Sequence, residues 1–99
     1  MQNLRYVGKN LFLERVSIQN FLKKNKTPFY IYSESQIVSN YFNFVKTFKK
    51  TNPLVCFAAK SNSNTHILKV LGKLGAGADV VSGGELLKAL KAGIKPKKI

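Results

Sequence analysis

The chain has 99 residues, of which 17 are Lys or Arg and 4 are Asp or Glu, giving a formal net charge of +13. Hydrophobic residues make up 44%, a share typical of globular domains. No apolar run approaches the roughly 18 residues of a membrane span, and the amino terminus lacks a signal-peptide core. Cys56 is the single cysteine, which excludes an intramolecular disulfide, and we expect it to be a small core residue. We expect a cytoplasmic protein.

The strong positive charge leaves a nucleic-acid-binding function open. An excess of Lys and Arg is typical of proteins that bind nucleic acid or anionic membranes. Here the lysines are scattered, Arg5 and Arg15 are the only arginines, and the aromatic residues are mostly Phe in helical or strand patterns. A small basic βα module that binds RNA or another anion therefore stays an alternative. The salt dependence of nucleic-acid binding would separate it from an enzyme.

Residues 1–26 differ in pattern from the rest of the chain. Two short extended segments, at residues 6–7 and 11–13, are expected on either side of a turn at Gly8. Residues 17–24 then predict a short helix, which ends at the break around Pro28.

An alternation of strands and helices begins after Pro28. Residues 29–32 predict a short strand, and Ser33 with Gln36 has the spacing of a capping box at the start of a helix. We expect Lys49 and Lys50 in the last turn of that helix. Its apolar residues recur at helical spacing: Ile37, Val38, Tyr41, Phe42, Val45 and Phe48.

Two further strand–helix pairs follow. The uncharged run 54–59 predicts a buried strand, and the polar turn 61–64 leads to a second helix that ends at Gly75. Residues 77–81 predict a third strand. The apolar residues of the second helix are Ile67, Leu68, Leu71 and Leu74, and those of a third helix, opened by Gly83-Gly84 and closed by Gly93, are Leu86, Leu87 and Leu90. Residues 96–99 resemble the approach to a fourth strand.

The order βαβαβα with short loops predicts an α/β fold with a parallel sheet. Three parallel strands leave two unpaired edges, and a closed (β/α)8 barrel needs about 250 residues. We therefore expect the chain to be a fragment of a larger protein.

Lys60 is the first candidate for chemistry, because it directly follows the apolar run 54–59. The carboxyl ends of parallel strands carry the active sites of α/β proteins. Desolvation there would disfavour the ammonium form and free the amine as a nucleophile for a Schiff base. The alternative is a lysine that caps the strand and extends into water.

Two carboxylates are expected near the same sheet edge. Asp79 lies in the predicted third strand, and neighbouring parallel strands are about 5 Å apart, so its carboxylate could approach the Lys60 amine. Glu85 follows the Ser82-Gly83-Gly84 turn. Asp79 as an ordinary strand-end residue, and Glu85 as a first-turn helix acid favoured by the helix dipole, are the structural alternatives.

The motifs together resemble a known enzyme family over nearly the whole chain, most strongly over residues 27–99. The chain is similar to the amino-terminal part of the diaminopimelate decarboxylases, which are fold-type III pyridoxal-phosphate decarboxylases related to the ornithine and arginine decarboxylases. The motifs that carry the resemblance are Thr27-Pro28-Phe29-Tyr30-Ile31-Tyr32-Ser33, Phe57-Ala58-Ala59-Lys60-Ser61-Asn62, Gly75-Ala76-Gly77-Ala78-Asp79-Val80-Val81-Ser82-Gly83-Gly84-Glu85-Leu86 and Ala92-Gly93-Ile94-Lys95-Pro96-Lys97-Lys98-Ile99.

The resemblance implies the first βα units of an alanine-racemase-like (β/α)8 TIM barrel beside a β-domain. Residues 1–26 would contribute to the β-domain, and residues 27–99 would form a truncated pyridoxal-phosphate-binding barrel domain. The family also implies a homodimer with active sites at its interface, no membrane association and no nucleic-acid partner.

The resemblance further implies pyridoxal 5′-phosphate as cofactor, held by Lys60 as a Schiff base. Asp79 matches the acidic residue close to that lysine, and Glu85 a glutamate near the active site. The full-length protein would decarboxylate meso-2,6-diaminopimelate to L-lysine, and the fragment alone would be inactive. No metal is implied. A relative acting on ornithine, arginine or carboxynorspermidine stays an alternative. His66 and Cys56 match no active-site position, and we expect His66 to face solvent.

Overall fold

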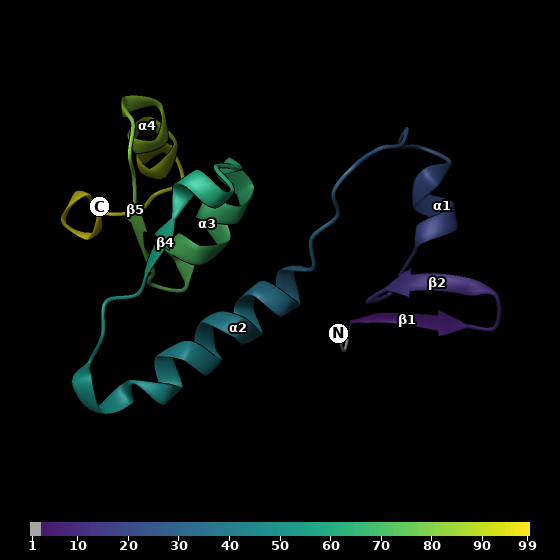
Figure 1. Cartoon of the computed structure of the whole chain (residues 1–99), viewed down its shortest axis with the longest axis horizontal. Helices are drawn as coiled ribbons and strands as arrows, with labels where there is room; N and C mark the ends of the chain where they lie inside the picture. The colour runs from purple at the N-terminus through teal and green to yellow at the C-terminus, as the bar shows by residue number, and fades with distance from the viewer. Residues whose placement is uncertain (1–2) are drawn as a thin grey trace. The chain divides into compact units, whose positions relative to one another are not determined.

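The computed structural model describes residues 3–99, and these divide into two compact units, residues 3–36 and 37–99. Figure 1 shows a strand hairpin with a short helix in the first unit and a small parallel sheet with helices in the second. The boundary between the units falls within helix α2. The predicted assignment of residues 1–26 to a β-domain stays a prediction.

The first unit is built on an antiparallel hairpin. Strands β1 (Leu4–Val7) and β2 (Asn10–Leu13) pair with Val7 opposite Asn10, and Gly8 takes the turn with a φ of +62°. This confirms the two predicted extended segments. The two-residue strand β3 (Val16–Ser17) adds to β2 and was not predicted.

Helix α1 (Ile18–Leu22) follows directly and is shorter than the predicted helix over residues 17–24. Its first turn is capped by Ser17, whose hydroxyl accepts a hydrogen bond from the Asn20 N–H at 3.4 Å. The ring of Phe21 meets the ring of Phe29 edge-on, with 5.2 Å between the ring centroids. This contact places the segment after α1 within the same unit.

The strand predicted at residues 29–32 is not formed, so that prediction was wrong. A strand needs a neighbour for its backbone N–H and C=O groups. Among the described residues, the parallel sheet has two strands and neither pairs with this segment. Tyr30 is consequently 91% exposed.

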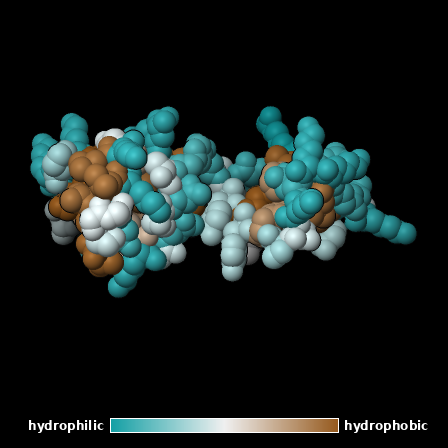
Figure 2. All heavy atoms as spheres, turned by 90° about the horizontal axis from the view of Figure 1, so that it is seen from above, coloured by the Kyte–Doolittle hydropathy of each residue, from teal (hydrophilic) through white to brown (hydrophobic). Residues whose placement is uncertain are grey.

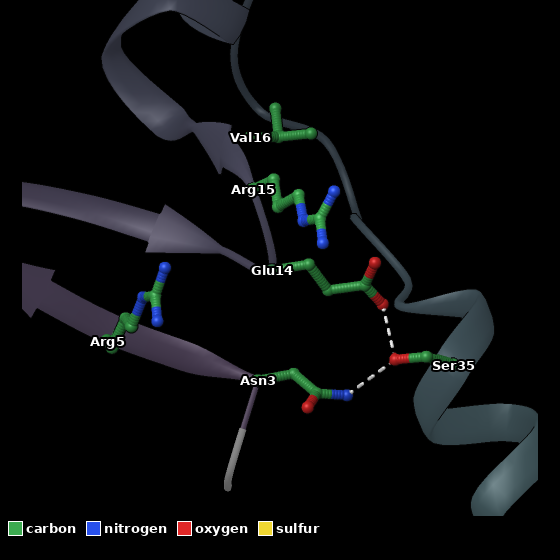
Figure 3. Close-up of a pocket in the computed structure, with 6 residues that line it drawn as sticks. All are labelled: Asn3, Arg5, Glu14, Arg15, Val16 and Ser35. Carbon is green, nitrogen blue, oxygen red and sulfur yellow. Dashed lines mark hydrogen bonds between the residues drawn. The ribbon is translucent and has the colours of Figure 1, made fainter.

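Helix α2 (Glu34–Thr47) begins where the capping-box spacing predicts, because the Ser33 hydroxyl accepts from the Gln36 N–H at 3.1 Å. A polar cluster of the first unit meets this helix start (Figure 3). The Ser35 hydroxyl donates to the Glu14 carboxylate at 2.7 Å and accepts from the Asn3 side-chain amide at 3.0 Å. Ser33 also donates to Glu14. These two hydroxyls lower the pKa of Glu14, with Ser33 the larger cause.

The end of α2 differs from the prediction. The α-helix stops at Thr47, and Lys49 and Lys50 lie in a separate 3-10 turn, η1 (Lys49–Thr51), instead of the last helical turn. Asn52 then takes a left-handed conformation with a φ of +46° and redirects the chain.

The second unit contains the parallel sheet. Strands β4 (Cys56–Ala58) and β5 (Gly77–Asp79) pair in parallel, joined through the 3-10 turn η2 (Ala59–Ser61) and helix α3 (Thr65–Lys73). Helix α4 (Gly83–Lys91) and the 3-10 turn η3 (Pro96–Lys98) follow β5. Gly75 ends α3 with a φ of +98°, as predicted. Two of the three predicted parallel strands are therefore confirmed.

Small side chains let the helices approach the sheet closely. One buried cluster joins the strand ends to the helices and contains Ala59, Leu68, Ala78, Ala89, Ala92 and Ile94. A second cluster, of Ile67, Leu71 and Ala76, receives Ile37 and Tyr41 from α2. Removing these aliphatic side chains from water is the main stabilising contribution of this unit.

The amino end of the sheet is covered by the last residues of the chain. A Cβ atom at Gly77 would collide with the Lys98 carbonyl oxygen and with the Cys56 sulfur, so only glycine fits there. The Lys98 ammonium donates to the Gly75 carbonyl at 2.8 Å. Cys56 itself is exposed, which corrects the expectation of a core thiol. It begins β4, which has one strand neighbour among residues 3–99.

Several large apolar side chains of the second unit remain on the surface. Leu54 is 53% exposed and Leu87 on α4 is 60% exposed. On α4 the buried side chain is the small Ala89, and the three leucines predicted to form its apolar face are exposed. Figure 2 shows apolar patches among the hydrophilic side chains. Within residues 3–99, no helix has the length and apolar character needed to cross a membrane.

Candidate active site

Lys60 lies in η2, immediately after the carboxyl end of β4. Its neighbour Ala59 is fully buried in the cluster under the strand ends, whereas the Lys60 side chain is exposed. The buried Ala59 thus anchors the backbone next to Lys60, while the Lys60 amine is accessible to solvent. The expected desolvation of the amine is not seen, because the Lys60 side chain is exposed.

Asp79 is the last residue of β5 and is also exposed. The parallel register places it opposite Ala58, two residues before Lys60. Adjacent strand ends therefore carry an amine and a carboxylate at the same edge of the sheet, as the sequence predicts.

Glu85 lies in the first turn of α4 and is partly buried. Its carboxylate accepts a hydrogen bond from the Val81 N–H at 2.8 Å, and its own N–H donates to the Ser82 hydroxyl at 3.1 Å. This reciprocal arrangement resembles a capping box, with the carboxylate reaching one residue further back than usual. Glu85 therefore fixes the turn between β5 and α4, because it binds Val81, which is two residues after Asp79.

The charge pattern of the second unit singles out this edge. Asp79 and Glu85 are the only acidic residues among residues 37–99, which also contain Lys60 and many other lysines. Both carboxylates lie at or just beyond the carboxyl end of β5. The negative charge of the unit is thus concentrated where the amine of Lys60 emerges.

The loop after Lys60 is held by its own side chains. The Ser61 hydroxyl donates to the Ala58 carbonyl at 2.7 Å, and the Asn62 side chain accepts from the Asn64 N–H at 3.0 Å. The Asn64 side chain in turn caps α3 by accepting from the His66 N–H at 2.9 Å. His66 faces solvent, as predicted.

One further contact connects this loop to α4. The Lys88 ammonium donates to the Ser63 hydroxyl at 3.0 Å. Sequence reasoning missed both residues, because they are 25 positions apart and neither belongs to a recognisable motif.

These residues fit an aldehyde cofactor such as pyridoxal phosphate. A Schiff base requires an accessible amine, and a nearby carboxylate stabilises the positive charge that develops on its nitrogen. Lys60 supplies the first group, and Asp79, on the adjacent strand end, is in a position to supply the second.

A sequence model described as the pyridoxal-binding domain of the pyridoxal-dependent decarboxylases matches residues 34–99. The chain belongs to the pyridoxal-dependent decarboxylase family. The matched domain is the one that binds the cofactor, so the prediction of pyridoxal phosphate is confirmed at the level of the family.

Individual relatives are named diaminopimelate decarboxylase. The protein from Aquifex aeolicus is 46% identical over 96 residues, covering 97% of this chain and 22% of its own. The protein from Pseudomonas fluorescens is 43% identical over 99 residues, covering 100% of this chain and 24% of its own. The chain therefore spans about a quarter of the length of these relatives.

Solved structures agree with the predicted fold class. A crystal structure from Aquifex aeolicus matches 98% of this chain and 24% of its own with a TM-score of 0.92 at 44% identity. The diaminopimelate decarboxylase of M. jannaschii matches 98% of this chain and 24% of its own with a TM-score of 0.91 at 35% identity. The fold class, the first units of a pyridoxal-phosphate barrel enzyme, is thus confirmed.

Proposed function

We propose that this chain is part of an enzyme that decarboxylates meso-2,6-diaminopimelate to L-lysine, with Lys60 as the residue that holds the cofactor. The observation that carries the proposal is an accessible amine at the carboxyl end of β4 in a chain of this family. The substrate is supported by relatives of 40–53% identity that are named diaminopimelate decarboxylase. One M. jannaschii structure contains L-lysine, which is the product in this proposal.

Each residue of the site has a distinct part in the proposal. When bound, pyridoxal phosphate supplies an electron sink for the electron pair left behind by carbon dioxide. The Lys60 amine, at the carboxyl end of β4, would hold the cofactor through its aldehyde group. The Asp79 carboxylate stabilises positive charge on the Lys60 nitrogen and orients it. Glu85 holds the turn after β5 and so fixes the direction of the β5 end.

The finer parts of the proposal concern the whole enzyme. We expect a cytoplasmic homodimer without a nucleic-acid partner, and substrate choice set by residues outside this chain. The alternative substrates are ornithine, arginine and carboxynorspermidine. They are tested with the full-length product of the gene that encodes this chain: formation of L-lysine from meso-diaminopimelate is expected, and turnover of ornithine or arginine in its place would contradict the proposal.

The residue roles are tested in a chimera, in which this chain replaces the aligned segment of the Aquifex aeolicus relative. We expect the chimera to release carbon dioxide from meso-diaminopimelate. Lys60→Ala and Lys60→Arg should both abolish turnover, since a guanidinium stays protonated and cannot form the imine. Lys69→Arg, an exposed lysine on α3, is the matched control and should keep activity. Normal turnover in either Lys60 variant would show that the wrong lysine was chosen.

A further inference from the structure

Residues of helix α4 lie near the chain on both sides of Lys60. Below it, Ala59 is buried in the same cluster as Ala89 of α4, and both are fully inaccessible to solvent. Beyond it, Ser63 accepts the hydrogen bond from Lys88, the residue next to Ala89. Helix α4 therefore shares a buried apolar cluster with the residue before Lys60 and makes a charged hydrogen bond to the loop after it.

The same helix also fixes the neighbouring strand end. Glu85 and Lys88 are three residues apart on α4 and thus lie on one face of the helix. Glu85 binds the Val81 N–H after β5, and Lys88 binds the Ser63 hydroxyl in the loop after β4. One helical face thus connects the segments that follow Asp79 and Lys60.

We propose that Lys88 is a positioning residue, which holds the 61–64 loop against α4 and thereby sets the Lys60 amine relative to Asp79. The inference rests on the proposed function, because it assigns Lys60 to the cofactor. The internal hydrogen bonds of Ser61 and Asn62 fix the local shape of the loop. They do not fix where the loop lies relative to α4. The loop leads into α3, which packs against α4, and the Lys88–Ser63 hydrogen bond adds a direct side-chain contact between the loop itself and α4.

The Lys88–Ser63 hydrogen bond is removed in the chimera by two conservative variants, one for the donor and one for the acceptor. Lys88→Met keeps most of the aliphatic side chain and removes the ammonium donor, and Ser63→Ala removes the acceptor. Lys91→Met, an exposed lysine on the same helix, is the control. The first readout is hydrogen exchange of the backbone amides of residues 61–66, which does not depend on cofactor chemistry. We expect exchange several-fold faster in Lys88→Met and Ser63→Ala, no faster in the double variant than in either single variant, and unchanged in Lys91→Met.

The second readout is the rate at which pyridoxal 5′-phosphate becomes attached to Lys60. Samples are taken at timed intervals, the attached cofactor is fixed by borohydride reduction, and its position is found by peptide mapping. We expect this rate to fall roughly three- to tenfold in Lys88→Met and Ser63→Ala, with thermal midpoints equal to that of the parent protein. Unchanged exchange, or faster exchange with an unchanged attachment rate at Lys60, would overturn the positioning role and leave the proposed function standing. If the parent protein itself attaches the cofactor elsewhere, the proposed function and the positioning role are both wrong, whatever the exchange result.

Discussion

Asp79 of β5 pairs in parallel register with Ala58 of β4, and Ala58 is two residues before Lys60. This register places Lys60 and Asp79 at the ends of adjacent strands, on the same edge of the sheet. Ala58 also receives the hydrogen bond from Ser61 through its carbonyl, so the same residue anchors both the ladder and the loop. The carboxyl end of β4 is thus held both by its pairing with β5 and by the loop after Lys60.

The charge of Asp79 should matter more for the reaction than for folding. In the chimera, Asp79→Asn keeps the size of the side chain and removes the charge that favours a cationic nitrogen on Lys60. We expect turnover to fall roughly tenfold or more, equivalent to about 1.4 kcal/mol or more of activation free energy. Cofactor content and thermal midpoint, measured beside turnover, should stay close to those of the parent protein. If turnover is unchanged, or falls only in step with stability, Asp79 is a structural strand residue.

Two substitutions of Glu85 separate its cap from its charge. Glu85→Gln keeps an oxygen that accepts from the Val81 N–H, whereas Glu85→Ala removes it. We expect Glu85→Ala to lower the free energy of unfolding by about 1 kcal/mol, the usual effect of losing a helix cap, and Glu85→Gln by less. Denaturant unfolding of the chimera measures this. If the Glu85 charge also acts on the cofactor, Glu85→Gln will weaken cofactor binding at nearly unchanged stability. Equal stability of Glu85→Ala and the parent would contradict the capping role.

The Glu14 cluster predicts a pH dependence in the first unit. Hydrogen bonds from Ser33 and then Ser35 lower the pKa of Glu14, so their stabilisation is complete above the ordinary glutamate pKa of about 4.3 and is lost as the pH falls through the lowered folded value. We expect Ser35→Ala to raise the Glu14 pKa toward the ordinary value, and Ser33→Ala to raise it further. A carboxyl NMR titration measures both shifts. An unchanged Glu14 pKa in both variants would show that these hydroxyls do not hold the carboxylate in solution.

The 99-residue chain by itself should not catalyse decarboxylation. The strands β4 and β5 have unpaired edges in the described chain, and apolar side chains such as Leu54 and Leu87 are more than half exposed. We therefore expect the isolated chain to be partly unfolded or poorly soluble. Its near-ultraviolet circular dichroism and its release of carbon dioxide from meso-diaminopimelate test this. Appreciable turnover would contradict the view that residues outside this chain complete the site.

Local patterns predicted most of the second unit, because its elements depend on neighbours close in sequence. The glycine at the end of α3 follows from a short motif, and the parallel β4–β5 pair follows from the alternation of strands and helices. In the first unit, the Ser33–Gln36 cap follows from the spacing of the two residues. The strand predicted at residues 29–32 was wrong because strand formation depends on a partner that the local pattern does not reveal. The expected burial of Cys56 was wrong for the same reason, since an apolar run does not show how many neighbours its strand will have.

The candidate site was also predicted in part: its three motif residues could be placed from the sequence, and its long-range side-chain contact could not. Lys60, Asp79 and Glu85 could be placed at one sheet edge from the order of strands and helices. The Lys88–Ser63 contact could not, because it joins two ordinary polar residues across 25 positions. Side-chain hydrogen bonds of this kind depend on how α4 packs against the rest of the unit, and a local sequence motif does not show this packing.

The central claim, that Lys60 holds the cofactor, is tested most directly by locating the attached pyridoxal phosphate. The chimera is incubated with pyridoxal 5′-phosphate, reduced with borohydride and digested, and the modified lysine is identified by mass spectrometry. The account predicts stoichiometric modification at Lys60 and its loss in Lys60→Arg, with no transfer to other lysines. Modification of the parent protein at a different lysine, or an unmodified Lys60 in a catalytically active protein, would contradict it.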